Sequence, residues 1–302
     1  MATLKGQNFR VAVYNGENEY TVVAKATNCT ITYGTNTNDA STKDDTGMAS
    51  KPEVTSKNWQ VQVESLNVTD MATMLTAIKN MTPFQLAWDE TDSNNNYTAE
   101  GAAFARMGKA FLTDATFSFN DRENSSKQLQ FSGSGAVESA VGAIFTQGAS
   151  TGYTKGQYVR LFLGSDNTAA PSTVIASAKT LQVHVSISME DATTKDTDGD
   201  WQIQEPTALS FDISTNALVR ANDTITSSVG AKSLNDLQNI YQNSTPVKFQ
   251  IANVSGANQR TKGTVIMSGS VIVSQLTLNN PNRQNSTYDA QLQGYGDYTV
   301  GA

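Results

Sequence analysis

The stretch Trp59-Gln60-Val61-Gln62-Val63-Glu64 decides the fold, because apolar and polar side chains alternate strictly along it. A period of two places the apolar side chains on one face of a β-strand and the polar side chains on the other. The same alternation returns in Leu181-Gln182-Val183-His184-Val185-Ser186-Ile187 and in Leu209-Ser210-Phe211-Asp212-Ile213-Ser214. Each run predicts a strand with one face on a core, so the chain is expected to be mainly β.

Helical periodicity is clear in two places, Asp70 to Asn80 and Ser233 to Asn243. Apolar residues recur there at helical spacing, Asp70 and Ser233 are suitable N-caps, and a Thr-Pro pair ends each segment. The sequence therefore predicts two short helices among many strands.

Composition excludes several classes of protein. The only cysteine is Cys29 and the only histidine is His184, so no disulfide framework, Cys/His zinc site or Ser-His-Asp unit is available within one chain. Cys29 reads as a small buried hydrophobe. The net charge of −7 is spread without a basic cluster, which argues against tight nucleic-acid binding. The acidic run Asp196 to Asp200 lacks the EF-hand spacing, which favours a solvated loop over a calcium site. With a single histidine and a single cysteine in the chain, we expect no metal, no cofactor and no enzymatic activity.

The second half of the chain repeats the first. Lys5-Gly6-Gln7 with Arg10 returns as Lys155-Gly156-Gln157 with Arg160, and the strand that starts at Trp59 corresponds to the one that starts at Leu209. The order of strands, long polar loop, helix and final strand pair is kept in both halves, which indicates duplication with loop insertions. We predict a first domain at 1–138, a linker rich in Gly, Ala, Ser and Thr at 139–152, and a second domain at 153–302. Each is expected to be a β-sandwich or curled sheet with one flanking helix.

The motifs then resemble a known family. An N-terminal Lys-Gly before a strand, the loop Thr42-Lys43-Asp44-Asp45-Thr46-Gly47, and the alternating strand from Trp59 to Leu66 are similar to the major tail (tail tube) proteins of phages with long non-contractile tails. The resemblance implies stacked rings of six domains, hence a homotrimeric, pseudo-hexameric ring for a duplicated chain. It also implies inner strands that form a barrel around a DNA channel, an outer helix, and a place in the virion tail after synthesis in the host cytoplasm. Implied partners are other tail proteins (tape measure, terminator, baseplate) and passing double-stranded DNA, without a membrane.

Physical reasoning favours such a ring as well, because open sheet edges template further pairing and ring closure removes them. The polar faces of the strands are then candidates for the channel lining. In the first half these residues are Thr30, Thr32, Gln60, Gln62, Glu64, Asp114, Thr116, Ser118, Gln128 and Gln130, and in the second half Gln182, His184, Ser186, Ser210, Asp212, Ser214, Gln275, Thr277, Asp289 and Gln291. None is Lys or Arg, which suits a passage for DNA because cations would pair with phosphates. The alternative is an ordinary solvent face of low charge.

The polar excursions Thr35 to Lys57 and Met189 to Pro206 are longer than ordinary hairpin loops. We expect them to make ring-to-ring contacts, through the candidate residues Thr42, Lys43, Asp44, Asp45, Thr194, Lys195, Asp196 and Asp198. Two other functions stay open: another virion ring such as a tail terminator or baseplate ring, and a tandem β-sandwich binding module, for example one that binds carbohydrate. Trp59, Trp88 and Trp201 are not clustered in the sequence pattern, which argues against the second.

Overall fold

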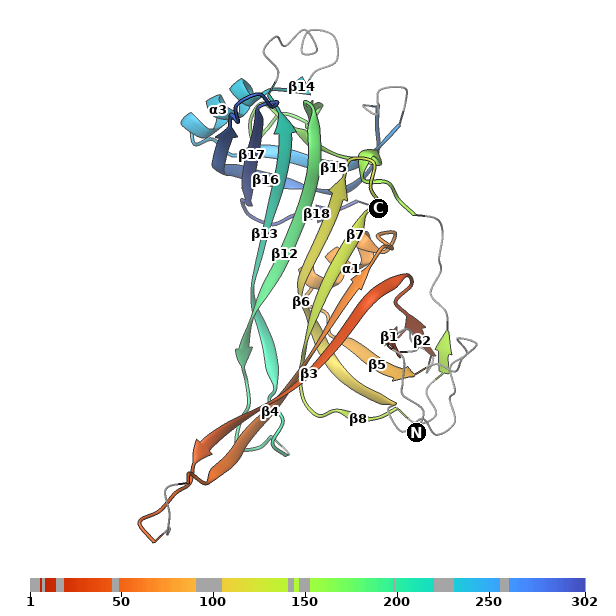
Figure 1. Cartoon of the computed structure of the whole chain (residues 1–302), viewed down its shortest axis with the longest axis vertical. Coiled ribbons are helices and arrows are strands. Elements are labelled where there is room, and N and C mark those ends of the chain that lie inside the picture. The colour runs from red at the N-terminus through yellow and green to blue at the C-terminus, as the bar shows by residue number, and fades with distance from the viewer. Residues whose placement is uncertain are drawn as a thin grey trace.

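The computed structural model shows a mainly β protein in which long strands form one large, curled sheet (Figure 1). The residues that the structure describes are 6, 9–14, 19–44, 49–90, 105–140, 144–146, 153–197, 199–219, 231–255 and 261–301. The predicted fold class is confirmed.

Among its described residues, the first half of the chain contains nine strands and helix α1. In chain order these are β1 (Phe9–Tyr14), β2 (Glu19–Val22), β3 (Ala26–Asp39), β4 (Pro52–Ser65), α1 (Met71–Lys79), β5 (Phe84–Glu90), β6 (Arg106–Asn120), β7 (Ser126–Gly133), β8 (Glu138–Ser139) and β9 (Ile144–Thr146). Strand β9 lies inside the predicted linker and pairs in parallel with β2.

The second half repeats this series after a short 3-10 helix at Gly156–Tyr158, except that it has an extra short strand, β14, before its helix and no described equivalent of β9. Its elements are β10 (Val159–Leu163), β11 (Thr173–Ile175), β12 (Ala178–Asp191), β13 (Gln204–Leu218), β14 (Ala231–Lys232), α3 (Leu234–Gln242), β15 (Val247–Ser255), β16 (Thr261–Asn279), β17 (Thr287–Gly294) and β18 (Thr299–Val300).

The antiparallel strand pairings are the same in the two halves. Within the first half β1 pairs with β2 and β5, β3 with β4, β4 with β7, and β6 with β5, β7 and β8. Within the second half β10 pairs with β11 and β15, β12 with β13, β13 with β17, and β16 with β15, β17 and β18. Each antiparallel pairing within one half therefore has a counterpart in the other. The parallel pairings differ, because β2 pairs with β9 after the last strands of the first half, whereas β11 pairs with β14 before the helix of the second half.

Fine backbone detail also repeats. The positive φ angles of Lys25, Met81, Arg122 and Gly135 return at Ser177, Ser244, Arg283 and Gly296. The register shift of β6 between Leu112 and Asp114 returns in β16 between Val273 and Gln275. Left-handed residues and bulges are costly features that a fold adopts at particular positions. Their coincidence defines a counterpart for each residue.

Pairing corrects one predicted match. Gln62 pairs with Gln130 and Ser214 pairs with Gln291, so β13 follows β4 by 152 residues. The counterpart of Trp59 is therefore Phe211, not Leu209. Both rings lie over a glycine of the neighbouring strand, Gly133 under Trp59 and Gly294 under Phe211. The aromatic ring occupies the volume that a side chain there would need.

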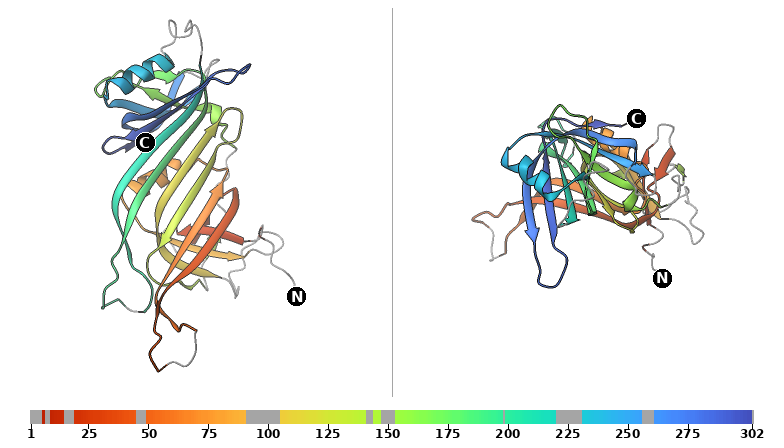
Figure 2. Two further views of the ribbon diagram at one scale, coloured as in Figure 1. Left: turned by 60° about the vertical axis from the view of Figure 1, so that its left-hand side comes forward. Right: turned by 90° about the horizontal axis from the view of Figure 1, so that it is seen from above.

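The two halves are joined edge to edge by β6 and β12. These strands pair antiparallel from Thr180 opposite Asn120 to Ser186 opposite Asp114. We call this pairing the internal seam. It makes one continuous sheet in the order β3, β4, β7, β6, β12, β13, β17, β16, which the side view shows as adjacent long strands (Figure 2).

One hydrophobic core runs through both halves beneath this sheet. It includes Trp59, Phe117 and Val183, and α1 adds Met71, Met74, Leu75 and Ile78. Helix α1 also receives the second half, because Tyr298 donates a hydrogen bond of 2.7 Å from its hydroxyl to the Leu75 carbonyl. The helix therefore covers the internal seam as well as its own strands.

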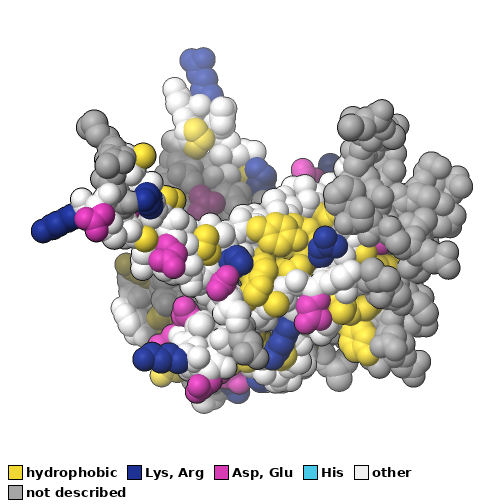
Figure 3. All heavy atoms as spheres, turned by 90° about the horizontal axis from the view of Figure 1, so that it is seen from below, with side chains coloured by type: hydrophobic (Ala, Val, Ile, Leu, Met, Phe, Trp, Pro, Cys, Tyr) yellow, Lys and Arg dark blue, Asp and Glu magenta, His cyan; other side chains and the backbone are white. Residues whose placement is uncertain are grey.

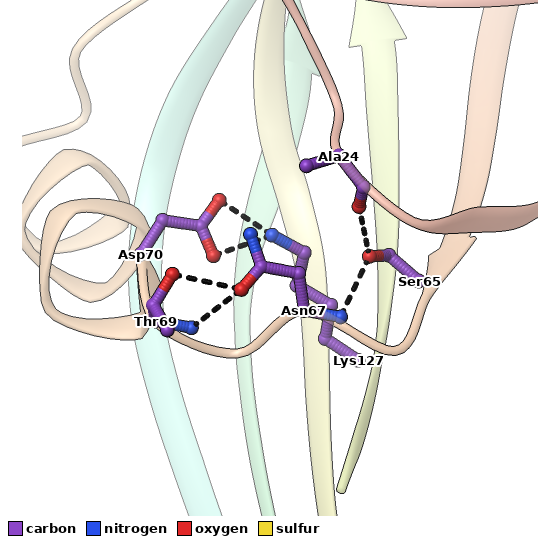
Figure 4. Close-up of polar contacts among 6 residues, drawn as sticks. All are labelled: Ala24, Ser65, Asn67, Thr69, Asp70 and Lys127. Atoms are coloured by element: carbon purple, nitrogen blue, oxygen red, sulfur yellow. Dashed lines mark hydrogen bonds and ion pairs between the residues drawn. The ribbon is translucent and has the colours of Figure 1, made fainter. Parts of the chain in front are cut away.

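The two helix N-termini are stabilised differently. Ser233 forms a capping box with Asp236, as the sequence predicts for an N-cap. Asp70 occupies the other N-cap position but makes no cap bond, because its carboxylate binds the buried ammonium of Lys127 at 2.5 Å (Figure 4). Burial lowers the pKa of Lys127, and the Asp70 carboxylate opposes part of this effect. Asn67, Thr69 and Ser65 complete the polar turn before the helix (Figure 4).

The long polar excursions are shorter than predicted. Strands β3 and β4 extend to Asp39 and from Pro52, and β12 and β13 extend to Asp191 and from Gln204. Loops 40–51 and 192–203 remain, and both hairpins project from the same end of the molecule (Figure 1). The outer ends of these four strands have no core beneath them and show no apolar/polar alternation. For this reason the sequence pattern placed the loop boundaries too far inside the strands.

Candidate self-association surface

The candidate channel residues lie on one face of the continuous sheet. Residues directly opposite in antiparallel strands point to the same side. One cross-strand row is Thr30, Gln62, Gln130, Asp114, Ser186 and Ser210. A second is Glu64, Gln128, Thr116, His184 and Asp212, and a third is Ser118, Gln182, Ser214, Gln291 and Gln275.

Thr32 and Gln60 pair at one end of this face, and Asp289 and Thr277 pair at the other. Every one of these side chains is exposed or half-buried, and the rows contain no Lys or Arg. The strand alternation in the sequence thus identified a real polar face, which crosses the internal seam without a break.

His184 lies at the internal seam between two carboxylates. Its Nε2 is 2.6 Å from Oδ2 of Asp114 on β6, and its Nδ1 is 2.7 Å from Oδ1 of Asp212 on β13. Burial lowers the pKa of His184, but the hydrogen bonds and charges of Asp212 and Asp114 outweigh it, so the pKa is raised. A protonated ring donates to both carboxylates and joins the two halves. The sequence placed His184 on the polar face but gave no sign of these partners.

Two sheet edges lie open. Strand β3 pairs with β4 on one side only, and the part of β16 beyond its register shift pairs only with β17 among the described residues. The equivalent part of β6 is covered by β12, and β12 is the counterpart of β3. The open edges are therefore the counterparts of the two edges that form the internal seam.

Four exposed apolar side chains occupy positions whose counterparts in the other half are buried. Tyr33, Tyr241, Leu278 and Tyr295 are between 45% and 54% exposed. Their counterparts in the other half are Val185, Ile78, Phe117 and Ser134, and none of these is more than 8% exposed. The counterparts are buried where the other half of the chain covers them.

Tyr33 lies on the apolar face of an edge strand. It shares that face of β3 with Cys29 and Ile31, but its ring is more than half exposed. Because β3 pairs only with β4 among the described residues, no further strand covers this ring. Cys29 is half-buried, and burial raises the pKa of its thiol, which suits an unreactive side chain.

The two loops at the hairpin ends are placed differently. Loop 192–203 lies against the first half, where Lys57 accepts a backbone hydrogen bond from Gln202 and pairs through its ammonium with Asp200 at 3.0 Å. Thr194, Lys195 and Asp196 stand at its exposed tip. The described part of loop 40–51 is exposed throughout, including Thr42, Lys43 and Asp44. Asp45 and Asp198 lie outside the described residues.

The face seen from below carries no concentrated charge among its described residues. Seen from below, the end that carries the hairpins shows Lys and Arg interspersed with Asp and Glu, and hydrophobic side chains gather between them (Figure 3). Among the described residues, no cluster of three or more His, Cys, Asp or Glu side chains is arranged to hold a metal ion. None of the described helices is long and apolar enough to cross a membrane.

Comparison with known proteins gives matches at the level of solved structures. No family model and no curated protein sequence matches the chain. A chain of the virion of a native gene transfer agent particle aligns with 49% of this chain and 99% of its own, at 14% identity and a TM-score of 0.37. A chain of the tail of an empty gene transfer agent particle with C6 symmetry aligns over the same shares at 14% identity and 0.38.

The tail tube of SPP1 aligns with 49% of this chain and 78% of that chain, at 14% identity and a TM-score of 0.33. All three are virion or tail structures. These three similarities, at 14% identity and TM-scores below 0.5, do not place the chain in a family.

Proposed function

We propose that the protein is a structural virion protein, a phage tail tube (major tail) protein that self-assembles into closed rings. The rings stack into the tube that carries DNA. One observation carries the proposal: the chain already contains one seam of such a ring and presents the two edges that form the next. In this proposal the domains are residues 1–138 and 153–302, and three chains supply the six domains that the sequence resemblance implies.

The internal seam predicts the register of the open one. Transferring each pair to its counterparts sets β3 of one chain against β16 of another. The expected pairs are Thr30 with Asn279, Ile31 with Leu278, Thr32 with Thr277, Tyr33 with Leu276, and Gly34 with Gln275. Tyr33 and Leu278 lose their exposure in this arrangement, and the unpaired backbone of both edges is satisfied.

Energetics favour a closed ring over a single contact. Burying the exposed half of each of the four apolar side chains contributes about 1 kcal/mol, from roughly 1.5–3 kcal/mol for full burial. Association costs roughly 4–15 kcal/mol in lost freedom, so one seam alone is weak. Closure adds the last seam without another association step, and for this reason we expect monomers and rings with few intermediates.

The polar face supplies the proposed channel. With the sheet closed, its rows of Thr, Ser and Gln face the axis together with Glu64, Asp114, Asp212 and Asp289. Carboxylates repel phosphates weakly, over about 10 Å at ordinary salt. His184 lies on this face between Asp114 and Asp212, which balance its charge. A face without Lys or Arg binds DNA poorly and lets it pass. The exposed loop tips at Thr42 to Asp44 and Thr194 to Asp196 remain proposed ring-to-ring contacts.

A crosslinking experiment tests the seam and its register. In a Cys29→Ala background, Ile31→Cys with Leu278→Cys places two thiols opposite each other between chains. We expect oxidation to give covalent closed oligomers that sediment as single species and show a central hole in negative stain. Ile31→Cys with Leu276→Cys is the matched control, because it is offset along the strand. Equal crosslinking of both pairs, or monomers at every concentration, would overturn the proposal.

A further inference from the structure

We propose that residues 49–52 of one chain clasp the second half of the neighbouring chain, on a site made by Leu209, Tyr295 and Gly296. The clasp rests on the proposed ring and adds to it a sideways role for the base of the long loop. Its occupant is a second copy of this chain. Among the described residues, the chain makes an equivalent clasp across its own internal seam.

Inside the chain, loop 192–203 reaches across the internal seam and adds to the edge of the first half. The backbone N–H of Lys57 donates to Asp200 at 2.6 Å, Gln202 donates to Lys57 at 2.9 Å, and Gly135 donates to Gln202 at 2.8 Å. The hydroxyl of Ser134 accepts from the N–H of Gln204 at 3.0 Å and donates to its carbonyl at 3.2 Å. This contact buries Ser134.

Each member of this contact has a counterpart at the open edges. Leu209, Tyr295 and Gly296 correspond to Lys57, Ser134 and Gly135 on the receiving side. Ser50 and Pro52 correspond to Gln202 and Gln204 on the loop. Gly296 has the same left-handed backbone as Gly135, with φ of 77° and 86°. The backbone geometry that receives the internal clasp is therefore present a second time.

The second receiving site is uncovered in the isolated chain. Tyr295 is 53% exposed, whereas Ser134 is 8% exposed. Gly296 donates no backbone hydrogen bond to any of the described residues. Ser50 and Pro52 are exposed at the far edge of the sheet. Ser50 and Pro52 on the loop, and Tyr295 and Gly296 on the receiving side, thus lie at opposite edges that meet only between chains.

Side chains at the two sites differ in a matched way. Ser134 needs the N–H of Gln204 as a donor, and Pro52 at the equivalent position has no N–H. The receiving side changes with it, since Tyr295 offers a ring in place of a hydroxyl. A proline against a tyrosine ring is an apolar contact that needs no donor. Lys57, which pairs with Asp200 inside the chain, is replaced by the apolar Leu209 on the receiving side.

The geometry assigns two backbone hydrogen bonds to the clasp, from Gly296 to the Ser50 carbonyl and from Ser50 to the Leu209 carbonyl. The Pro52 ring then covers Tyr295. Contacts of this kind extend the sheet at its edge, and the apolar pair gives specificity. The base of the loop, at residues 49–52, contacts the neighbouring chain of the same ring in this arrangement, and Thr42 to Asp44 stay available to an adjacent ring.

A pair exchange tests the clasp. Tyr295→Ser is expected to raise the protein concentration needed for half assembly about tenfold, which corresponds to about 1.4 kcal/mol. Tyr295→Ser with Pro52→Gln recreates the internal Ser134–Gln204 pair and is expected to recover assembly. Tyr158→Ser, which removes an exposed ring away from both edges, is the matched control. Sedimentation velocity gives the concentrations, and thermal melting confirms that each variant is folded.

The outcomes separate this inference from the ring itself. Suppose that the wild type assembles and that the cysteines introduced at positions 31 and 278 crosslink. If Tyr295→Ser then assembles at the same protein concentration as the wild type, the proposed clasp is wrong and the proposed ring still holds. Failure of the double variant to recover assembly also overturns it, because the pair exchange then has no basis. Where the wild type never assembles, the ring and the clasp fall together.

Discussion

The buried ion pair between Lys127 and Asp70 gives the sharpest stability prediction. The Lys127 side chain is 1% exposed and its ammonium touches both carboxylate oxygens, whereas the Asp70 side chain is 33% exposed. Asp70→Ala leaves a charged group in the core with its main partner gone. Removing one partner of a buried ion pair lowers the free energy of unfolding by roughly 3–5 kcal/mol. Because the Asp70 side chain is partly exposed, water can solvate Lys127 from the vacated site, so we expect about 3 kcal/mol.

A loss of about 3 kcal/mol lowers the melting temperature by roughly 6–12 °C, at about 2–4 °C per kcal/mol for a domain of 150–250 residues. Lys127→Met together with Asp70→Ala is expected to recover most of the loss, because it removes the unpaired charge as well. The second half already has uncharged residues at the equivalent positions, the buried Tyr288 and the half-buried Ser233.

Thermal melts followed by circular dichroism measure both variants. Asp297→Ala serves as the control, because it breaks the ion pair with Lys79 at 3.1 Å, where Asp297 is 62% exposed. Exposed pairs contribute about 0–1 kcal/mol, so this control melts close to the wild type. A drop for Asp70→Ala no larger than that of the control would refute the reasoning, as would a double variant that melts no higher than Asp70→Ala.

Two further predictions concern the internal seam and the core. Because the pKa of His184 is raised on folding, its contribution to stability is complete below about pH 6.5, its unfolded value, and is lost as pH rises through the folded value. The difference in melting temperature between wild type and His184→Gln should therefore shrink from about pH 6 to about pH 9, and a pH-independent difference would contradict the role of the two carboxylates. Gly133→Ala places a Cβ within van der Waals overlap of the Trp59 ring and should cost about 1–3 kcal/mol by overpacking, whereas Gly6→Ala, with open space around it, should leave the urea midpoint unchanged. Equal midpoints for both glycine variants would show that the ring moves freely.

The sequence predicted the long strands and both helices because their burial is one-sided. Val61 and Val63 are fully buried while Gln60 and Gln62 are exposed, so alternation is visible by inspection. Strands β5 and β15 escaped this reasoning. Ala87 on β5 and Ala252 on β15 are buried in small secondary clusters on the opposite face from the main core. A strand that is apolar on both faces loses the period of two.

The candidate site was predictable as a face but not as an edge. Alternation tells which side chains share a face, and every predicted channel residue among the described strands is exposed or half-buried. It contains no information on which strand lies at the end of a sheet, because backbone pairing leaves no side-chain period. The partners of His184 were hidden for the same reason: Asp114 and Asp212 reach it only through the register of three strands. Comparison of the two halves, residue by residue, identifies the open edges once the pairing is known.

The internal seam also sets the parity of any assembly built from this chain. Because each chain brings two units already joined in register, a ring of whole chains holds an even number of units. Rings with five or seven units, the nearest errors around six, would need half a chain and cannot close. Covalent linkage of two units therefore excludes rings with an odd number of units, without any contact that is specific for ring size. The diameter of the proposed tube is fixed more narrowly as a result.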